Sequence, residues 1–172
     1  MKKRTYLMLI LTHFIEVSLM AEFTLSSSAF KNFEPIPEKY TCHGEDPSPD
    51  LSWTNPPPGT QSFALSVQDP DSPKGNLTHW LAYNIPKELT ELPPNMGSSP
   101  VAINGICQGM NHFGKAGYGG PCPPPNQRHR YIFTLYALDT RLEIPPLASY
   151  AAFQEAIQSH ILAKAELIGL FK

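Results

Sequence analysis

The sequence predicts a mainly β protein, an antiparallel β-sandwich with a few peripheral helices. Three segments, at 62–69, 79–85 and 129–138, alternate apolar and polar residues with a period of two, which is typical of half-buried strands. Turn residues are frequent, with 19 prolines and 11 glycines among 172 residues, and this composition disfavours long helices. Many short strands with one late helical segment indicate two packed sheets.

The first two strand segments predict a hairpin with ionisable groups at one end. In the first segment Phe63, Leu65, Val67 and Asp69 are expected to lie on one face of the strand. In the second segment the residues expected on one face are His79, Leu81, Tyr83 and Ile85. Antiparallel pairing brings the end of one strand to the start of the next, so Asp69 and His79 are expected side by side. Pro70 and Pro73 fix φ and donate no hydrogen bond, which predicts a stiff connection.

The third segment also begins with a histidine. Its apolar face is expected to consist of His129, Tyr131, Phe133, Leu135 and Ala137. Three inward faces that each end in an ionisable group are what a core with a polar pocket at its mouth requires. Arg130 alternates to the opposite face, where we expect it to form a structural ion pair.

The remaining segments are expected to be mostly irregular. Repeated Pro and Gly argue against helix in residues 23–53, and residues 55–59 form a proline-rich connector. Residues 86–100 are expected to be a loop with one helical turn. Residues 104–129 are the least regular part, and a loop of that length in a compact domain is usually functional or disordered. Its aromatic residues favour a function.

One amphipathic helix is expected late in the chain, with Ser149 as its N-cap. The spacing i, i+3, i+4, i+7 places the following residues on one face of this helix: Phe153, Ala156, Ile157, His160, Ile161 and Lys164. Most of this face is expected to lie on a sheet. Residues 167–171 then predict a closing strand, and Trp53 and Trp80 are expected to be packing residues.

Length and charge limit the function. A chain of 172 residues with 41% hydrophobic residues suits one domain, here residues 22–172. The net charge of −2 provides no general cationic field, so nucleic acid is not expected as a partner.

The amino terminus has two interpretations. Residues 1–21 have a basic start, an apolar run and Ala21 as a cleavage point, which is typical of a signal peptide and favours a periplasmic or secreted protein. The alternative is that translation starts at Met20 and the protein is cytoplasmic. The apolar run is shorter than the roughly 20 residues of a membrane-spanning helix, so stable membrane insertion is not expected.

The three cysteines, Cys42, Cys107 and Cys122, are odd in number and form no Cys-x-x-Cys pair. We therefore expect neither a disulfide framework nor a zinc ribbon, but small, partly buried thiols. One disulfide stays possible if the protein is exported.

Several short motifs recur together in this order in one protein family. They are Tyr40-Thr41-Cys42, Ser52-Trp53, Asp69-Pro70-Asp71-Ser72-Pro73, His79-Trp80, Gln108-Gly109, the Gly/Pro-rich run 117–124 and His129-Arg130-Tyr131. With these motifs the chain resembles the phosphatidylethanolamine-binding proteins, in the bacterial branch described as similar to the Raf kinase inhibitor protein. The resemblance extends over nearly everything after residue 22.

The resemblance implies a Greek-key β-sandwich with a small anion-binding cavity at one end of the sheets. The residues that it places at or beside this cavity are Asp69, Asp71, Pro73, His79, Gly119, Gly120, Pro121, His129 and Tyr131. It implies phosphate or a phospholipid head group as ligand, and for some members the inhibition of kinases or serine proteases. Two residues depart from the family pattern: His112 stands where bacterial relatives usually carry aspartate, and Phe171 where a tyrosine is expected.

The chemistry of an anion site assigns the acids an indirect role. A carboxylate that accepts an imidazole N–H fixes the tautomer and favours the cationic ring, and Asp69 with His79 is the expected pair. Tyr131 and the amides of Gly119 and Gly120, in an anion-binding nest, are expected to add donors. Anion affinity is then expected to rise as pH falls through the histidine range. His43, His112 and His160 are expected to be ordinary loop or helix residues.

Two other functions are compatible with these residues. A hydrolase would use His79, His129 and Asp69 around a metal, or Cys122 as a nucleophile near His129. A protein-interaction module would instead bind a kinase or protease through loops 86–100 and 104–125. No recognisable catalytic motif supports the hydrolase, so we expect a non-enzymatic binding protein without a cofactor or a metal.

Overall fold

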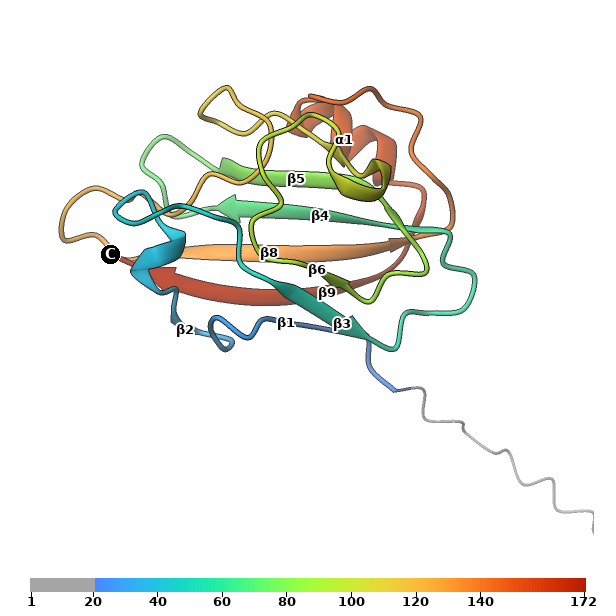
Figure 1. Cartoon of the computed structure of the whole chain (residues 1–172), viewed down its shortest axis with the longest axis horizontal. Coiled ribbons are helices and arrows are strands. Elements are labelled where there is room, and N and C mark those ends of the chain that lie inside the picture. Colours follow the sequence, from blue (N-terminus) through green and yellow to red (C-terminus); the bar gives the residue numbers. More distant parts are fainter. Residues whose placement is uncertain (1–20) are drawn as a thin grey trace, which may run out of the picture.

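The strands form two sheets that lie face to face (Figure 1). The computed structural model describes residues 21–172, so the expected signal peptide at 1–21 lies almost entirely outside the described residues. The six-stranded sheet has the order β2-β9-β8-β4-β5-β7 and the three-stranded sheet the order β1-β3-β6. All strand pairs are antiparallel except β2 with β9. The mainly β prediction is confirmed.

The elements follow one another in a fixed order. They are β1 (Thr24–Ser26), β2 (Glu34–Pro35), the 3-10 turn η1 (Glu38–Tyr40), β3 (Leu51–Thr54), β4 (Ser62–Asp69), β5 (Leu77–Pro86), β6 (Glu91–Leu92), the 3-10 turn η2 (Ile103–Gly105), β7 (Cys107–Gln108), β8 (His129–Leu138), α1 (Tyr150–Ile157) and β9 (Ile161–Phe171). In Figure 1 the long strands β5, β4, β8 and β9 lie side by side across the molecule.

The β4–β5 hairpin is the centre of the larger sheet. Its two strands pair antiparallel, as expected, from Ser62 opposite Pro86 to Asp69 opposite Leu77. After β5 the chain runs through residues 87–128 and returns to the other side of β4 as β8. The start of β8, which carries His129, therefore lies beside the end of β4, which carries Asp69.

The main core lies between the two sheets. Side chains that fill it include Leu25, Leu51, Trp53, Leu92, Phe63, Leu65, Val67, Trp80, Tyr131, Phe133, Leu135 and Leu167. The alternation expected for β4 and β8 is confirmed by this set, and both tryptophans are buried as expected. Burial of such residues is the dominant favourable contribution to folding, at roughly 25 cal/mol per Å² of apolar surface.

Two β-bulges change which residues of β5 face this core. Val67 pairs with Trp80 and Gln68 with Thr78, which leaves His79 as an extra residue in the strand. A bulge interrupts the alternation of faces and re-aims a side chain. The ring of His79 consequently lies 5.1 Å from the core residue Tyr131, centroid to centroid.

The second bulge lies at Asn84, which has a positive φ of 57°. Between the bulges Leu81 and Tyr83 face the opposite side of the sheet, in a second cluster under α1. The prediction that His79, Leu81, Tyr83 and Ile85 share one face is therefore wrong. The bulges at His79 and Asn84 turn Leu81 and Tyr83 to the face opposite His79 and Ile85.

The outer side of the larger sheet is covered by α1. Ser149 caps this helix, since its hydroxyl accepts a hydrogen bond from the Ala152 amide at 3.3 Å. Phe153 and Ile157 pack into the cluster with Tyr83 and Tyr136. No helix among residues 21–172 is both long and apolar enough to cross a membrane.

Two segments differ from the prediction, one in where its strand begins and the other in its type of secondary structure. The closing strand begins at Ile161 and not at 167, because β9 pairs with β8 along its whole length and this pairing overrides the local helical spacing of Ile161 and Lys164. Residues 86–100 contain strand β6 in place of a helical turn, since Leu92 is buried against β3.

Candidate functional site

A cavity of about 460 Å³ opens at the end of the sandwich where the β4–β5 connection meets the start of β8. Its walls are Asp69, Ser72, Pro73, Lys74, Leu77, His79, His112, Phe113, Cys122, Pro123, Pro124 and His129. It therefore brings together four of the predicted site residues, Asp69, Pro73 and His79 from the β4–β5 hairpin and His129 from the start of β8.

Asp69 and His129 form a buried pair on the floor of this cavity. The Nδ1–H of His129 donates to Oδ2 of Asp69 at 2.8 Å, and Oδ1 of Asp69 accepts from the Asp71 amide at 2.9 Å. Both carboxylate oxygens are thus engaged. The expected Asp69–His79 pair is wrong: His79 is the extra residue of the bulge in β5 and its ring bonds to Gly119, so Asp69 contacts His129 at the start of β8 instead.

His79 is held by the main chain. Its Nδ1–H donates to the carbonyl oxygen of Gly119 at 2.6 Å, whereas its Nε2 is buried and has no hydrogen-bond partner among residues 21–172. The residue is 2% exposed. Burial lowers its pKa to about 4, although the bond to Gly119 opposes this shift. At neutral pH the ring is therefore uncharged.

The other predicted site residues lie behind the cavity wall. Tyr131 is buried against His79, and its hydroxyl has no partner among the described residues; burial raises its pKa. The amide of Gly119 donates to the His79 carbonyl at 2.9 Å, and that of Gly120 to Oδ1 of Asp46 at 2.8 Å. These two amides therefore do not form the expected anion-binding nest. Pro121 accepts a hydrogen bond from the Cys42 amide at 3.1 Å.

Asp71 faces away from the cavity and holds the loop. Its carboxylate accepts from Nη2, Nε and the amide of Arg130, at 2.7, 2.8 and 2.9 Å. Hydrogen bonds from Arg130 lower the pKa of Asp71 to about 2. The expected structural ion pair of Arg130 is confirmed, and the carboxylate of Asp71 is not on the cavity wall.

His112 and Phe113 are the wall residues that the sequence prediction missed. The Nδ1–H of His112 donates to the Thr78 carbonyl at 2.9 Å, and its ring lies 4.6 Å from that of His79 and 3.7 Å from that of Phe113. His112 was expected to be an ordinary loop residue. The available signal was its place in the long irregular loop, at a position where it departs from the family pattern.

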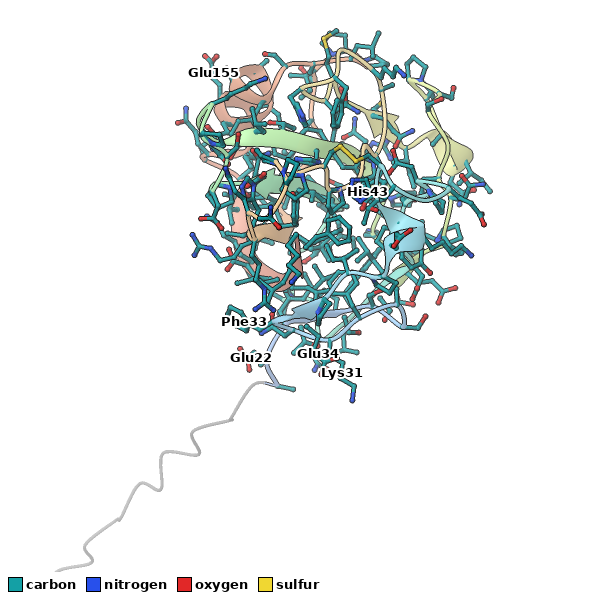
Figure 2. The ribbon with its side chains drawn as sticks, turned by 90° about the vertical axis from the view of Figure 1, so that its left-hand side faces the viewer. Glu22, Lys31, Phe33, Glu34, His43 and Glu155 are labelled. Atoms are coloured by element: carbon teal, nitrogen blue, oxygen red, sulfur yellow. A yellow bond between two sulfur atoms is a disulfide. The ribbon has the colours of Figure 1, made fainter. Side chains whose placement is uncertain are left out.

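A disulfide joins two loops at the rim. Cys42 and Cys122 are bonded, with 5.5 Å between their Cα atoms, and Cys107 is free. Figure 2 shows this bond above η1, beside His43. The expectation of three thiols is wrong for two of them. Cys122 cannot be the nucleophile of a hydrolase in this form, because its sulfur is already bonded.

A second depression lies at the ends of β2 and β9. It has a volume of about 510 Å³ and is lined by Pro35, Ile36, Arg128, Leu170, Phe171 and Lys172. It contains none of the nine predicted site residues, so the cavity between Asp69, His79 and His129 is the candidate site.

Comparison with known sequences identifies the family. A family model described as "Phosphatidylethanolamine-binding protein" matches residues 26–172. A UPF0098 protein of Aquifex aeolicus is 47% identical over 148 residues, which cover 85% of this chain and 86% of that protein. The UPF0098 protein YbhB of Escherichia coli is 36% identical over 155 residues, covering 86% and 98%.

Solved structures agree with this family. YbcL of Escherichia coli, described as a new member of the mammalian PEBP family, superposes with a TM-score of 0.83 at 34% identity, over 88% of this chain and 99% of YbcL. The Chlamydia trachomatis homologue CT736 gives 0.79 at 37% identity, over 87% and 97%. On these grounds the chain belongs to the phosphatidylethanolamine-binding protein family.

Proposed function

We propose that the protein binds a phosphate-containing ligand, free phosphate or a phospholipid head group, in the cavity at the end of the sandwich. The observation that carries this proposal is a pair of buried polar atoms, Nε2 of His79 and the hydroxyl of Tyr131, that have no partner among residues 21–172. Buried polar groups are nearly always hydrogen-bonded, so atoms left free beside a cavity indicate a ligand. Membership of a family of ligand-binding proteins supports the same conclusion.

The charges of the cavity wall suit an anion. Asp69 is the only acid that the described residues place on this wall, and both oxygens of that carboxylate are already engaged by His129 and Asp71. Lys74 lies on the wall as a cation. The prolines of the wall have no N–H group, so they shape the cavity but donate no hydrogen bond to the ligand.

Replacement of His129 by asparagine is expected to weaken phosphate binding at least about 10-fold, because it removes an imidazole that Asp69 orients and leaves a buried carboxylate short of a partner. Titration calorimetry with inorganic phosphate and with phosphorylethanolamine measures the loss. His160 offers a matched control, since its Nδ1 donates to Asp139 at 2.7 Å in an exposed pair outside the cavity.

The control variant His160→Asn is expected to bind as the unchanged protein does. Two results would contradict the proposal: no binding of either probe to the unchanged protein at millimolar concentration, or equal affinity in His129→Asn and His160→Asn.

A second candidate function is the binding of a protein partner, such as a kinase or a serine protease, through the loops around the cavity. The observation that favours it is a group of large apolar side chains in one stretch of chain, Val101, Ile103, Met110 and Phe113, each at least 43% exposed. Exposed apolar patches often mark interaction surfaces.

This second candidate predicts that Met110→Ser weakens capture of a candidate kinase or protease while phosphate binding stays unchanged. The measurement is a pull-down with and without excess phosphate. Leu162→Ser is the matched control, because Leu162 is comparably exposed on β9. Equal capture by Met110→Ser and Leu162→Ser would exclude the patch as the contact surface.

A further inference from the structure

The hydrogen bond between His79 and Gly119 determines which ring nitrogen carries the proton. A carbonyl oxygen can only accept, so the contact of 2.6 Å requires the proton on Nδ1. In a neutral ring the other nitrogen, Nε2, then has a lone pair and no proton. Nε2 is therefore an acceptor, and it is the ring atom for which the described part of the chain provides no partner.

The surroundings of His79 disfavour a second proton on the ring. The rings of His112, Phe113 and Tyr131 enclose it at centroid distances of 4.6, 5.7 and 5.1 Å. Desolvation penalises the cationic imidazole most, and a neighbouring cationic His112 would repel it.

The other charged or titratable groups near His79 do not reverse this. Asp69 favours the cation, but its carboxylate already accepts the proton of His129. Lys74 adds positive charge to the same wall, and the hydroxyl of Tyr131 is neutral because burial raises its pKa.

A buried acceptor of this kind selects among anions. A fully deprotonated oxyanion has no hydrogen to donate. Its oxygen lone pair would face the lone pair of Nε2, and Nε2 would receive no hydrogen bond. A phosphate that retains one P–O–H group can donate this hydrogen to Nε2, while its other oxygens accept from Lys74 on the same wall. Sites with a buried polar group that must be matched discriminate strongly against ligands lacking the matching group.

We propose that this pocket is specific for phosphate species that carry a proton, inorganic phosphate or a phosphomonoester, and that it rejects sulfate and phosphodiesters without a donor. This inference rests on the proposed function, because it concerns the ligand of the same cavity. It distinguishes a free phosphomonoester from the phosphodiester of an intact lipid, whose phosphate has no proton to donate.

The test compares four probes by calorimetry at constant ionic strength: inorganic phosphate, phosphorylethanolamine, dimethyl phosphate and sulfate. At pH 7.5 phosphate is expected to bind at least about 10-fold more tightly than sulfate or dimethyl phosphate. Phosphorylethanolamine is expected to gain about 20-fold in affinity between pH 7.5 and 5.5, because a monoester takes up its proton near pH 6. Sulfate and dimethyl phosphate are expected to change little over that range.

The variant His79→Gln supplies an amide donor at the same place and is expected to lose the preference for phosphate over sulfate, whereas His160→Gln keeps it. A nitrogen NMR spectrum of phosphate-bound protein is expected to show His79 neutral, with its proton on Nδ1.

Failure of the inference and failure of the proposed function give different results. If none of the four probes binds at millimolar concentration, the proposed function fails and the inference fails with it. If all four bind equally, or if all tighten together as pH falls and His79 becomes an imidazolium, anion binding stands and the inference is overturned.

Discussion

Reduction of the Cys42–Cys122 disulfide is expected to lower the free energy of unfolding by about 4.5 kcal/mol, the chain-entropy value for a cross-link that closes a loop of this length. The two cysteines are 80 residues apart in sequence. Loss of the bond frees the unfolded chain to sample many more conformations, and this stabilises the unfolded state relative to the folded one.

The effect on ligand binding is expected to be smaller, only a few-fold. Cys122 lies on the cavity wall, but three hydrogen bonds hold the same two loops together independently of the disulfide. The Cys42 amide donates to Pro121, the Gly120 amide to Asp46, and the Tyr118 hydroxyl to the Tyr40 carbonyl at 2.7 Å. These contacts keep the loops docked in the reduced protein.

The measurement is urea unfolding with and without dithiothreitol, alongside phosphate titration of the same samples. A Cys107→Ser background removes the remaining thiol, so that any response to the reductant comes from the disulfide alone. An unfolding midpoint that does not move on complete reduction would contradict the prediction.

The long strands were predictable because their sequences alternate. The β4–β5 hairpin, the inward face of β8 and the outward direction of Arg130 all follow from a period of two. Two of the predicted residues, His129 and Asp69, meet because the end of β4 and the start of β8 each carry an inward polar side chain.

The position of His79, the disulfide and the role of His112 could not be predicted, because they depend on contacts between distant parts of the chain or on strand irregularities that the residue pattern does not show. A β-bulge adds one residue without an obvious signal, so alternation could not place His79. The disulfide joins two residues whose Cα atoms lie 5.5 Å apart, and this proximity arises only when loops 80 residues apart in sequence fold together. His112 enters the cavity wall through the same kind of long-range folding, and its place in an irregular loop did not show which part of the molecule it would contact.

Acidification from pH 6.5 to pH 4 is expected to destabilise the protein by about 3 kcal/mol through His79 alone. The pKa of this histidine falls from an ordinary value of 6.5 in the unfolded chain to about 4 in the folded protein. Between these values the unfolded state binds more protons than the folded state, so stability decreases as pH falls. The contribution of His79 is complete above pH 6.5 and is lost as pH approaches 4.

Urea unfolding at several pH values between 4 and 7.5 measures this slope. His79→Gln has no proton to take up, so its stability is expected to depend less on pH in this window, whatever the absolute cost of the substitution. The exposed His160 is the matched control, and His160→Gln is expected to keep the full slope. Asp71 does not interfere, because its pKa in the folded protein is about 2. Its contribution to the stability of the protein is therefore lost below pH 4.

The same slope bears on the ligand. If His79→Gln kept the full pH dependence, His79 would take up its proton in the folded protein near its usual pKa, and Nε2 would be a donor and not an acceptor. A flattened slope in His79→Gln, together with tighter binding of phosphate than of sulfate, would instead trace both acid sensitivity and ligand selectivity to one cause. That cause is an imidazole whose Nδ1 proton is committed to Gly119 and whose other nitrogen is buried without a proton.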